Sequence, residues 1–490
     1  MDKKYYAVCT EKNSNLNRAS LCLRVFFLAL NLQQFHSTKE EIKKIFESEF
    51  SRHSDNTQIL ELMKYMSQPP AFTVIRVNTL KISVEEVIQD LEKYLIKTGT
   101  SYDSIFCFQQ YEEKQCLVPK VSKHSIINDI IVVQSCGLLK NCVPCEQEVI
   151  VDLQCGMAVL RGADVYVPGI MATSSSMQKD DKVAVYADLH RLCRKGQKQE
   201  FNGQKLFVGN GRTNISRIEL FKNSGMSRGI GIKLIEPAFD CPSLGDFNPS
   251  LIFLQNLPSV VCGHVLDPQP GQTILDMCAA PGGKTVHIAT LMKNQGTVIA
   301  LDRSKPKIRK IEENAKKFSI SCVKSFLFDS TKALSDMEFI NDDFSPPYPP
   351  KTFDKILLDA PCSCLGQRPL IVVSKADVKS YKALQLKLFK TAVALLKDGG
   401  TIVYSTCSLT LSENEENVAE MLDRFPSMSL VSQTPYLGFP GLKVEGLSED
   451  QLKLMQRFDY LSNYNNEELS VDTDTIGFFI AKFQKNKCLK

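Results

Sequence analysis

The chain has no hydrophobic run long enough to cross a bilayer. Its most apolar early stretch, residues 21–32, is interrupted by Arg24 and falls short of the ~20 residues that a membrane-spanning helix needs. Residues 31–35, Asn-Leu-Gln-Gln-Phe, do not form the small-residue cleavage site of a signal peptide. We therefore expect an ordinary core helix over residues 21–32 and no association with a membrane.

The cysteines lack the regular spacing of a disulfide framework. All 17 are scattered, and their odd number indicates free thiols in a reducing compartment. Cys142 and Cys145 form one CxxC pair, but neither a second pair nor paired histidines follow at ligand spacing, so we expect no metal site. A dense basic run of the nuclear-import type is also absent. We expect a cytoplasmic protein, and a monomeric one.

Two nucleotide-binding signatures and one methyltransferase signature are missing. The Gly-Gly-Lys loop at residues 282–284 has neither the GxxxxGK[ST] spacing of a phosphate-binding loop nor the GxGxxG pattern, so by itself it identifies no ligand. Methylation of an exocyclic amine normally calls for an Asn/Asp-Pro-Pro-Tyr/Phe loop after the fourth strand of the sheet. The chain has Asp-Ala-Pro-Cys there, at residues 359–362, which ranks that activity last among the alternatives.

Length and composition predict several folded domains. With 490 residues, of which 43% are hydrophobic, the chain is long enough for two or three domains with full cores. Residues 1–144 resemble an N-terminal α/β region, with helices over most of the first 70 residues, a strand from residue 72 to 78 and a helix from 84 to 96. Residues 145–238 carry short apolar runs separated by glycine and charge, which is typical of a small β-barrel.

Residues 239–490 alternate strands and helices. This alternation predicts an α/β fold with a doubly wound, mainly parallel sheet that has helices on both faces. Expected strands are residues 273–278, 297–301, 325–328, 353–358, 401–405 and 476–483, and expected helices are residues 284–292, 305–318, 381–396 and 415–425. Residues 342–351 contain four prolines and predict an exposed loop.

Positive charge gathers in the middle of the chain. Residues 161–233 hold 13 Lys and Arg against 6 Asp and Glu, a surplus of 7, so the rest of the chain, with an overall net charge of +4, is negative by 3. Such a segment is where a polyanion would bind. A solvated, lysine-rich surface is the alternative that the sequence alone leaves open.

Carboxylates follow three successive strands at the edge where open α/β sheets bind ligands. Asp302, Asp329 and Asp359 end the second, third and fourth expected strands. The first is placed to accept both ribose hydroxyls, and the second can accept from an adenine amino group. Each Asp can instead be a helix cap or turn residue, but three in succession favour an adenosine-containing cofactor. Lys307 can reach the same pocket or remain a solvated helix lysine.

Two cysteines occupy loops at this same edge. Cys362 and Cys407 stand in similar tripeptides, Pro-Cys-Ser and Thr-Cys-Ser, immediately after strands. A thiolate that adds to carbon 6 of cytosine makes carbon 5 nucleophilic enough to attack a sulfonium methyl group, and a second thiol can help to release the product. The residues alone do not say which cysteine attacks. Asp359 is close enough in sequence to Cys362 to hold the amino group and ring nitrogen of a cytosine, if it is protonated or paired with Lys284.

These motifs resemble those of the Sun-domain (NSUN) family of RNA cytosine-5 methyltransferases. The two cysteine motifs, the loop at residues 278–284 and Arg-Val-Asn-Thr-Leu at residues 76–80 carry the resemblance, which covers about residues 70–484. It implies a seven-stranded sheet whose last strand is antiparallel, S-adenosylmethionine as cofactor, Cys407 as nucleophile, Cys362 in product release and Asp359 beside the target base. The cofactor residues expected on this basis are Cys278, Ala279, Ala280, Pro281, Gly282, Gly283, Lys284, Asp302, Lys307, Asp329 and Asp359.

The basic segment adds a second resemblance. Residues 161–170 look like part of a PUA RNA-binding module, and a PUA module ahead of the catalytic domain is typical of family members that methylate transfer RNA near its CCA-bearing acceptor end. On this basis Arg161, Tyr166, Arg194 and Lys195 are the expected RNA contacts, with cations for phosphate and a ring for stacking. Tyr166 can alternatively be a core residue of the barrel. Messenger or ribosomal RNA as substrate is a further alternative.

Two departures from the family pattern bear on activity. The family usually has Gly after Pro-Cys-Ser, where this chain has Cys364, and the chain contains no tryptophan, although one often follows this motif. A Cβ at a glycine position strains the loop if φ is positive. An RNA-binding protein with impaired catalysis is therefore the rival hypothesis, although the retained thiols and acids argue against it.

Overall fold

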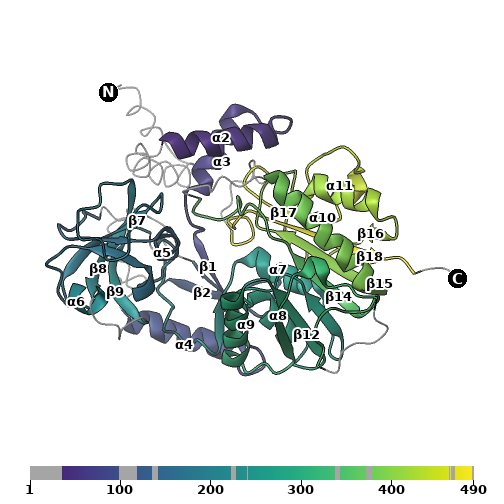
Figure 1. Ribbon diagram of the computed structural model, residues 1–490, viewed down its shortest axis with the longest axis horizontal. Helices are drawn as coiled ribbons and strands as arrows, with labels where there is room; N and C mark the ends of the chain where they lie inside the picture. The colour runs from purple at the N-terminus through teal and green to yellow at the C-terminus, as the bar shows by residue number, and fades with distance from the viewer. Residues whose placement is uncertain are drawn as a thin grey trace. The chain divides into compact units, whose positions relative to one another are not determined.

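The computed structural model describes residues 36–98, 119–134, 142–221, 228–239, 241–336, 343–370, 378–462, 464 and 470–487 (Figure 1). The apolar stretch at residues 21–32 lies outside them. The chain forms two compact units, one assigned Met1–Ile42, Cys136–Gly245 and Asn465–Glu468, and the other Lys43–Ser135, Asp246–Tyr464 and Leu469–Lys490. No described helix combines the length and hydrophobicity that a membrane crossing requires. The predicted boundaries at residues 144/145 and 238/239 stay a prediction.

The larger unit contains the expected doubly wound sheet. Its strands run in the order β13-β12-β11-β14-β15-β18-β16, parallel from β13 to β15 and antiparallel at β18. The bounds are β11 Thr273–Asp276, β12 Thr297–Asp302, β13 Val323–Leu327, β14 Phe353–Asp359, β15 Leu396–Thr406, β16 Met428–Leu430, β17 Met455–Phe458 and β18 Phe478–Lys485. The predicted sheet and its antiparallel last strand are confirmed.

The sheet has eight strands where seven were expected. β15 pairs along one edge of β18, and two short strands share the opposite edge, β16 opposite residues 483–485 and β17 opposite residues 478–481. The seven-membered ladder is intact, and β17 is the addition. Strands of three and four residues give too little alternation to be found in the sequence.

Helices cover both faces of this sheet because its central strands are apolar on both sides. Leu275, Ile356 and Ile402 pack into one buried cluster with residues of α10 (Val378–Leu395) and α11 (Glu415–Arg424). The sequence neighbours Ile274, Leu357 and Val403 pack into a second cluster with residues of α7 (Leu257–Leu266) and α8 (Gly283–Leu291). Successive side chains on a strand point to opposite faces, so the continuous apolar runs in these strands require two helical layers.

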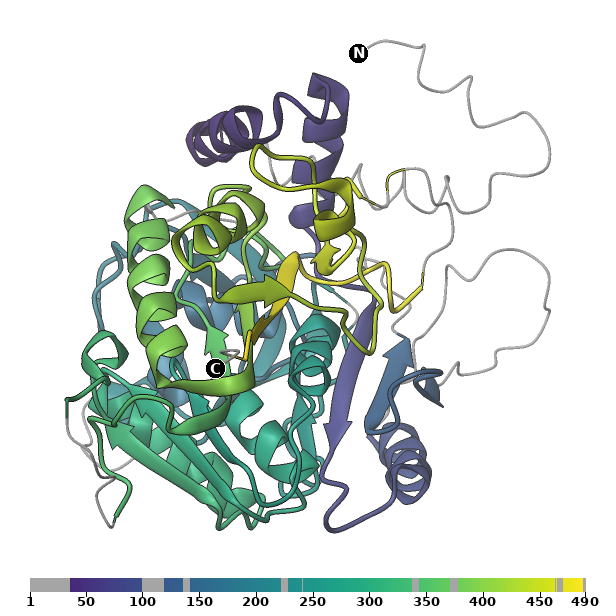
Figure 2. The same ribbon diagram turned by 90° about the vertical axis from the view of Figure 1, so that its right-hand side faces the viewer.

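The N-terminal residues of this unit build a smaller sheet beside the first. Its order is β10-β1-β3-β2, with β1 Phe72–Val77, β2 Lys120–Lys123, β3 Ile130–Gln134 and β10 Ile252–Leu254. Figure 2 shows β1 in purple alongside this sheet's blue strand and the helix α4 (Val84–Lys97). The predicted helices near residues 40–66 are α2 (His36–Phe50) and α3 (Asn56–Met66). Because β10 joins β1, the upstream region and the main sheet share one unit.

The proline-rich loop is less exposed than expected. Tyr348 is fully buried, its ring lies edge-to-face against Phe353 at 5.0 Å, and its hydroxyl donates to the carbonyl of Phe344. The prediction of an exposed loop is therefore wrong for most of residues 343–350, because one aromatic ring anchors the prolines to the core. Asp342 lies outside the described residues.

The smaller unit is a mixed sheet of six strands. The order is β5-β9-β8-β7-β4-β6, in which only the β4–β7 pair is parallel. The bounds are β4 Glu148–Val151, β5 Val165–Tyr166, β6 Ile170–Thr173, β7 Lys182–Asp188, β8 Lys205–Thr213 and β9 Ile230–Pro237, with helices α5 Leu153–Val159, α6 Arg217–Phe221 and the 3-10 turn η4 Val167–Gly169. The β-rich module expected around residues 145–238 is present.

Candidate active site

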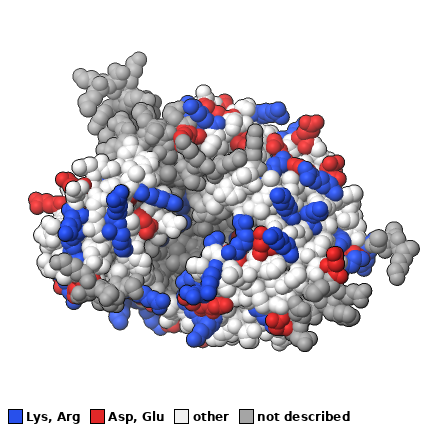
Figure 3. Space-filling view, viewed as in Figure 1, with Lys and Arg blue, Asp and Glu red and all other residues white. Residues whose placement is uncertain are grey.

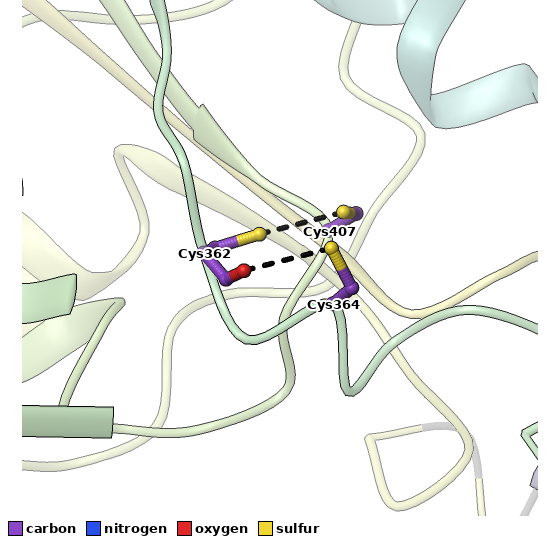
Figure 4. Close-up of side chains that lie close together, drawn as sticks. All are labelled: Cys362, Cys364 and Cys407. Atoms are coloured by element: carbon purple, nitrogen blue, oxygen red, sulfur yellow. Dashed lines mark hydrogen bonds between the residues drawn. The ribbon is translucent and has the colours of Figure 1, made fainter. Parts of the chain in front are cut away.

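The structure brings the two motif cysteines into contact. Cys362 follows β14 and Cys407 follows β15, and these neighbouring parallel strands end in register, with Asp359 opposite Ser405. Their loops therefore leave the sheet side by side at its carboxyl edge. The two Sγ atoms lie 3.4 Å apart (Figure 4). Cys362 is buried and Cys407 is partly exposed, so Cys407 is the more accessible thiol of the pair.

A buried glutamate that the sequence analysis did not identify ties the two cysteine loops together. Glu413 is fully buried, and its carboxylate accepts from the hydroxyls of Ser363 (2.5 Å), Ser408 (2.6 Å) and Thr410 (2.9 Å). The backbone N–H of Ser363 and the amide of Gln385 also donate to it. A buried charge is stable only when hydrogen bonds satisfy it. Its signal in the sequence was one of three glutamates within residues 413–416, shortly after the second motif, and nothing there distinguishes it from an exposed glutamate.

A close backbone approach locks the same loops. The N–H of Gly366 donates to the carbonyl of Cys407 at 2.9 Å, and the N–H of Gly477 donates back to the carbonyl of Gly366 at 2.7 Å. A Cβ at residue 366 would lie only 2.1 Å from the carbonyl oxygen of Gly477. Residue 366 therefore has to be glycine for the loop of Cys362 to reach the loop of Cys407.

Lys284 and Asp359 form an ion pair beside the thiols. Lys284 Nζ lies 2.8 Å from Asp359 Oδ2, while Asp359 Oδ1 accepts from the hydroxyl of Ser405 at 2.7 Å. Burial disfavours the charged lysine, but the carboxylate of Asp359 outweighs it and raises the pKa of Lys284 to about 12. Asp359 is therefore paired with Lys284, one of the two conditions under which its carboxylate was expected to hold a cytosine.

The loop between β11 and α8 has the geometry of a ligand-binding turn. Gly282 has φ +98°, and a Cβ there would lie 3.0 Å from the backbone of Ile311, so the turn needs glycine. Residues 278–284 run from the strand end into the start of α8, where backbone N–H groups lack helical partners. Asp276 anchors the turn by accepting from Thr285 at 2.7 Å, and burial raises the pKa of Asp276 to about 7.

The carboxylates expected to bind an adenosine group stand at the same edge. Asp302 ends β12 and uses Oδ1 to accept from the backbone N–H of Ser304. Asp329 follows β13 and caps a short 3-10 turn, where Oδ1 accepts both from the N–H and from the hydroxyl of Thr331. Asp329 is thus a capping residue through Oδ1, as the alternative interpretation proposed. None of its described hydrogen bonds uses Oδ2, so Oδ2 can accept a hydrogen bond from a ligand.

Lys307 behaves as a surface lysine. Its side chain is 62% exposed and lies 4.0 Å from Asp302 Oδ2. A pair at this distance and exposure contributes little. The structure therefore favours the solvated alternative for Lys307 over a role inside the pocket.

Cys364 is the third thiol of the site. It has φ +59°, so the strain expected from a side chain at the family's glycine position is present. Its Sγ lies 3.5 Å from the carbonyl oxygen of Cys362, and Figure 4 shows the sulfur atoms of Cys364 and Cys407 directed toward one another. Cys364 is exposed.

The three thiols compete for one negative charge. Hydrogen bonds from the thiols of Cys362 and Cys407 lower the pKa of Cys364 below its usual range. A hydrogen bond from Cys362 favours the thiolate of Cys407, but the neighbouring Cys364 and burial prevail and raise the pKa of Cys407 to about 11. Hydrogen bonding to the other two thiols and burial raise the pKa of Cys362. Of the three thiols, Cys364, which is the most exposed, is therefore the one whose surroundings favour the thiolate.

Two buried arginines fasten the N-terminal segments to this edge. Arg76, in β1, donates to the carbonyl of Gly283 at 3.0 Å. Arg368, in the loop after Cys362, pairs with Asp474 at 2.6 Å, and its guanidinium lies 3.6 Å from the ring centre of Tyr65. The upstream element predicted from residues 76–80 thus supports the cofactor loop directly.

The smaller unit carries the four residues that were predicted to contact RNA. Tyr166 is 43% exposed at the end of β5, so the alternative that it is a core residue is wrong. Lys195 donates from Nζ to the carbonyls of Pro168 (3.0 Å) and Val167 (3.3 Å), the two residues that follow Tyr166 in the chain. Arg161 and Arg194 are exposed. Blue Lys and Arg side chains stand on the surface of this unit in Figure 3.

The sequence and fold of this chain are similar to those of known RNA methyltransferases. The family described as 16S rRNA methyltransferase RsmB/F matches residues 263–484. Human tRNA (cytosine(72)-C(5))-methyltransferase NSUN6 is 44% identical over 87% of this chain and 91% of its own. The rRNA (cytosine-C(5))-methyltransferase NOP2C of Arabidopsis thaliana is 30% identical over 89% of each chain. A crystal structure of NSun6 from Pyrococcus horikoshii with SFG covers 91% of this chain and 98% of its own at TM-score 0.67 and 29% identity.

Proposed function

The chain belongs to the Sun-domain (NSUN) family of RNA cytosine-5 methyltransferases, and on this premise we propose that it methylates carbon 5 of a cytosine near the acceptor end of transfer RNA. The contact of 3.4 Å between the thiols of Cys362 and Cys407 carries the proposal. Methyl transfer to a poor carbon nucleophile needs one thiol that adds to the cytosine ring and a second group that helps to release the methylated product from that thiol. Both groups lie at the same edge of the sheet. The name of the human relative supports this substrate.

Cys407 is the proposed nucleophile because it is the more accessible of the two motif thiols. Its thiolate forms a bond to carbon 6 of the cytosine, and electron density moves to carbon 5. Bound S-adenosylmethionine supplies the methyl group that carbon 5 takes. The proton on carbon 5 then passes to a base and the bond between carbon 6 and Cys407 breaks, which restores the aromatic ring and frees the thiolate. Cys362 assists this release of the product.

Activation of Cys407 comes with the substrate. Its pKa of about 11 keeps the thiol protonated in the free protein, so the proton has to leave as the RNA binds. The ammonium group of Lys284 interacts electrostatically with both Asp359 and the sulfur of Cys407. When a cytosine engages the carboxylate of Asp359, the ammonium group of Lys284 is released to stabilise a thiolate.

The cofactor pocket fits S-adenosylmethionine. The turn at Gly282 gives close backbone approach, Asp302 offers acceptors for ribose hydroxyls, and Asp329 keeps Oδ2 for an adenine amino group. In this proposal the glycine turn positions the amino acid part of the cofactor and the two carboxylates hold the adenosine part.

The smaller unit serves as a PUA-like RNA-binding domain in this proposal. Its sequence segment has a basic surplus of 7, the side chain of Tyr166 is 43% exposed, and Lys195 is bound to the backbone that follows Tyr166. Stacking on a ring and cations for phosphates suit a single-stranded end such as CCA. The cytoplasmic location and the monomeric state remain predictions.

The proposal is tested by methyl transfer from labelled S-adenosylmethionine to small RNA. Wild type should yield 5-methylcytosine near the acceptor end of transfer RNA, Cys407→Ala should yield none, and Cys362→Ala should accumulate a covalent protein–RNA complex. Full turnover by Cys407→Ala would overturn the assignment of the nucleophile. Product on ribosomal or messenger RNA instead would change the substrate, and cofactor binding without product on any RNA would favour the rival binding protein.

A further inference from the structure

The three cysteines of the active site form a compact thiol cluster. The Sγ atoms of Cys362, Cys364 and Cys407 all lie within 4.8 Å of one another, and two of them are 3.4 Å apart. Figure 4 shows that the three sulfur atoms converge from two loops on one small space. The methyl transfer proposed above uses two thiols, so the reaction leaves Cys364 without a role.

The spacing of the cluster matches that of thiolates around one metal ion. A Zn–S bond of about 2.3 Å places two sulfur ligands of a tetrahedral ion about 3.8 Å apart, and two ligands of a trigonal ion about 4.0 Å apart. The Sγ atoms of Cys362 and Cys407 lie 3.4 Å apart, slightly closer than either value, and the Sγ atom of Cys364 lies within 4.8 Å of both. The three sulfur atoms are therefore near enough to one another to share one ion.

We propose that Cys362, Cys364 and Cys407 bind a thiophilic cation of the Zn²⁺ class, and that binding withdraws the nucleophile from catalysis. Three thiolates are a ligand set that selects soft or borderline cations over Mg²⁺ or Ca²⁺. Each thiol gives its proton to water as its sulfur binds the ion, so no electron changes hands. A fourth position is left for a water molecule.

The geometry supplies the features that a reversible site needs. Cys364 is exposed, so an ion can reach the site from solvent. Cys362 is buried, so the surrounding protein restricts the position of its sulfur atom. The network around Glu413 and the contact at Gly366 fix both loops, so the ligands are organised before the ion arrives. With glycine at residue 364, only two sulfurs would remain.

The inhibitory consequence rests on the proposed function, but binding itself does not. A metal-bound Cys407 has its lone pair engaged and cannot add to a cytosine ring. Zn²⁺ should therefore inhibit methyl transfer, and a chelator should restore it. The site would couple the activity to the concentration of free zinc.

The test is a titration of the full chain with Co²⁺, whose complexes with thiolates have a charge-transfer absorption band, followed by displacement with Zn²⁺. Wild type should bind one equivalent with the thiolate band. Cys364→Gly should lose the band or bind at least about tenfold more weakly, and its fold should survive because glycine tolerates the φ of +59°. Cys145→Ser, in the CxxC pair, is the matched control and should bind as wild type does.

Three outcomes would overturn the proposal. They are an unchanged thiolate band in Cys364→Gly, loss of the band in Cys145→Ser, and a Co²⁺ spectrum without thiolate ligands. The last would point to Asp129, His264 and His287, the other described group with ligand atoms within 4.8 Å of one another. The two proposals fail in different ways. Methyl transfer without metal binding would contradict only the proposed metal site, and metal binding without methyl transfer would contradict only the proposed reaction.

Discussion

Ser363 and Ser408 lie 45 residues apart in the chain, yet their hydroxyl oxygens are 3.0 Å apart, and both donate to the carboxylate of Glu413. Each serine follows a motif cysteine directly. The distance between the thiols of Cys362 and Cys407 is therefore set by hydrogen bonds one residue away, and Glu413 acts as a positioning residue.

Glu413→Gln should reduce kcat far more than it changes the KM for RNA. Glutamine keeps the size of the side chain but replaces one acceptor oxygen with a donor, which opposes the hydroxyls that now point at it. We expect kcat to fall about 10- to 100-fold, as for groups that orient a reacting atom. Glu416→Gln, at an exposed position of α11, is the control and should leave kcat near wild type. An equal loss in both variants would contradict the positioning role.

Cys364→Gly should shift the alkylation of Cys407 to lower pH. The neighbouring Cys364 raises the pKa of Cys407, so its removal lowers that pKa and increases the thiolate fraction at neutral pH. The rate of carboxamidomethylation at Cys407, followed by mass spectrometry from pH 6 to 10, measures the shift. Cys322→Ser is the control and should reproduce the wild-type profile. A profile unchanged in Cys364→Gly would show that the two thiols do not interact.

Lys284→Met and Lys307→Met should separate a pocket lysine from a surface lysine. Loss of Lys284 leaves the carboxylate of Asp359 unpaired beside the thiols, so we expect kcat/KM to fall by about 100-fold or more. Lys307 is 62% exposed and sits 4.0 Å from its partner, so its loss should change the KM for the cofactor less than about threefold. Similar effects of the two substitutions would contradict this assignment.

Gly366→Ala should destabilise the catalytic loops. The added Cβ would lie 2.1 Å from a backbone oxygen, and backbone has to move to relieve such a clash, at a cost of about 1–3 kcal/mol or more. A lower Tm and loss of activity are expected. Gly245→Ala, whose Cβ would come no nearer than 3.5 Å to the hydroxyl of Tyr166, is the matched control and should unfold as wild type does.

Tyr166→Ala should weaken RNA binding, whereas Tyr166→Phe should not. Stacking of a base on a ring is worth about 1–3 kcal/mol, so the alanine variant should bind acceptor-end RNA roughly 5- to 100-fold less tightly. Binding assays at fixed salt with RNA that ends in CCA or lacks it measure the effect. Equal affinity of both variants for both RNAs would exclude Tyr166 from the interface.

Periodicity predicted the main sheet well because its strands are buried on both faces and its helices are long. The residues at the strand ends, including Asp302 and Asp359, followed from topology alone. The sequence left the pairing of Asp359 with Lys284 as one of two alternatives, since two side chains 75 residues apart meet only in the folded sheet. Glu413 was missed for the same reason, because burial and five donors make it special and neither is visible in the sequence.

Local context also overturned specific interpretations. The prolines around Tyr348 predict exposure, but the buried ring of that residue holds the loop inward. β16 and β17 form because β18 offers them an edge, so their strand structure is imposed by the tertiary fold and not by propensity. Cys364 shows the opposite case: the sequence could state only that a Cβ strains the loop if φ is positive, and the structure supplies that φ, +59°.

The order in the four-stranded sheet has a consequence for how the chain is made. β1 pairs with β3 on one edge and with β10 on the other, and the chain leaves at Gln134, opposite Phe72, and returns at Ile252, opposite Val77. Exit and return are thus at opposite ends of β1, about 20 Å apart. During synthesis, one edge of β1 stays unpaired until β10 has left the ribosome, which happens only after the whole insert between β3 and β10 has been made. The insert can therefore finish folding before the domain that surrounds it.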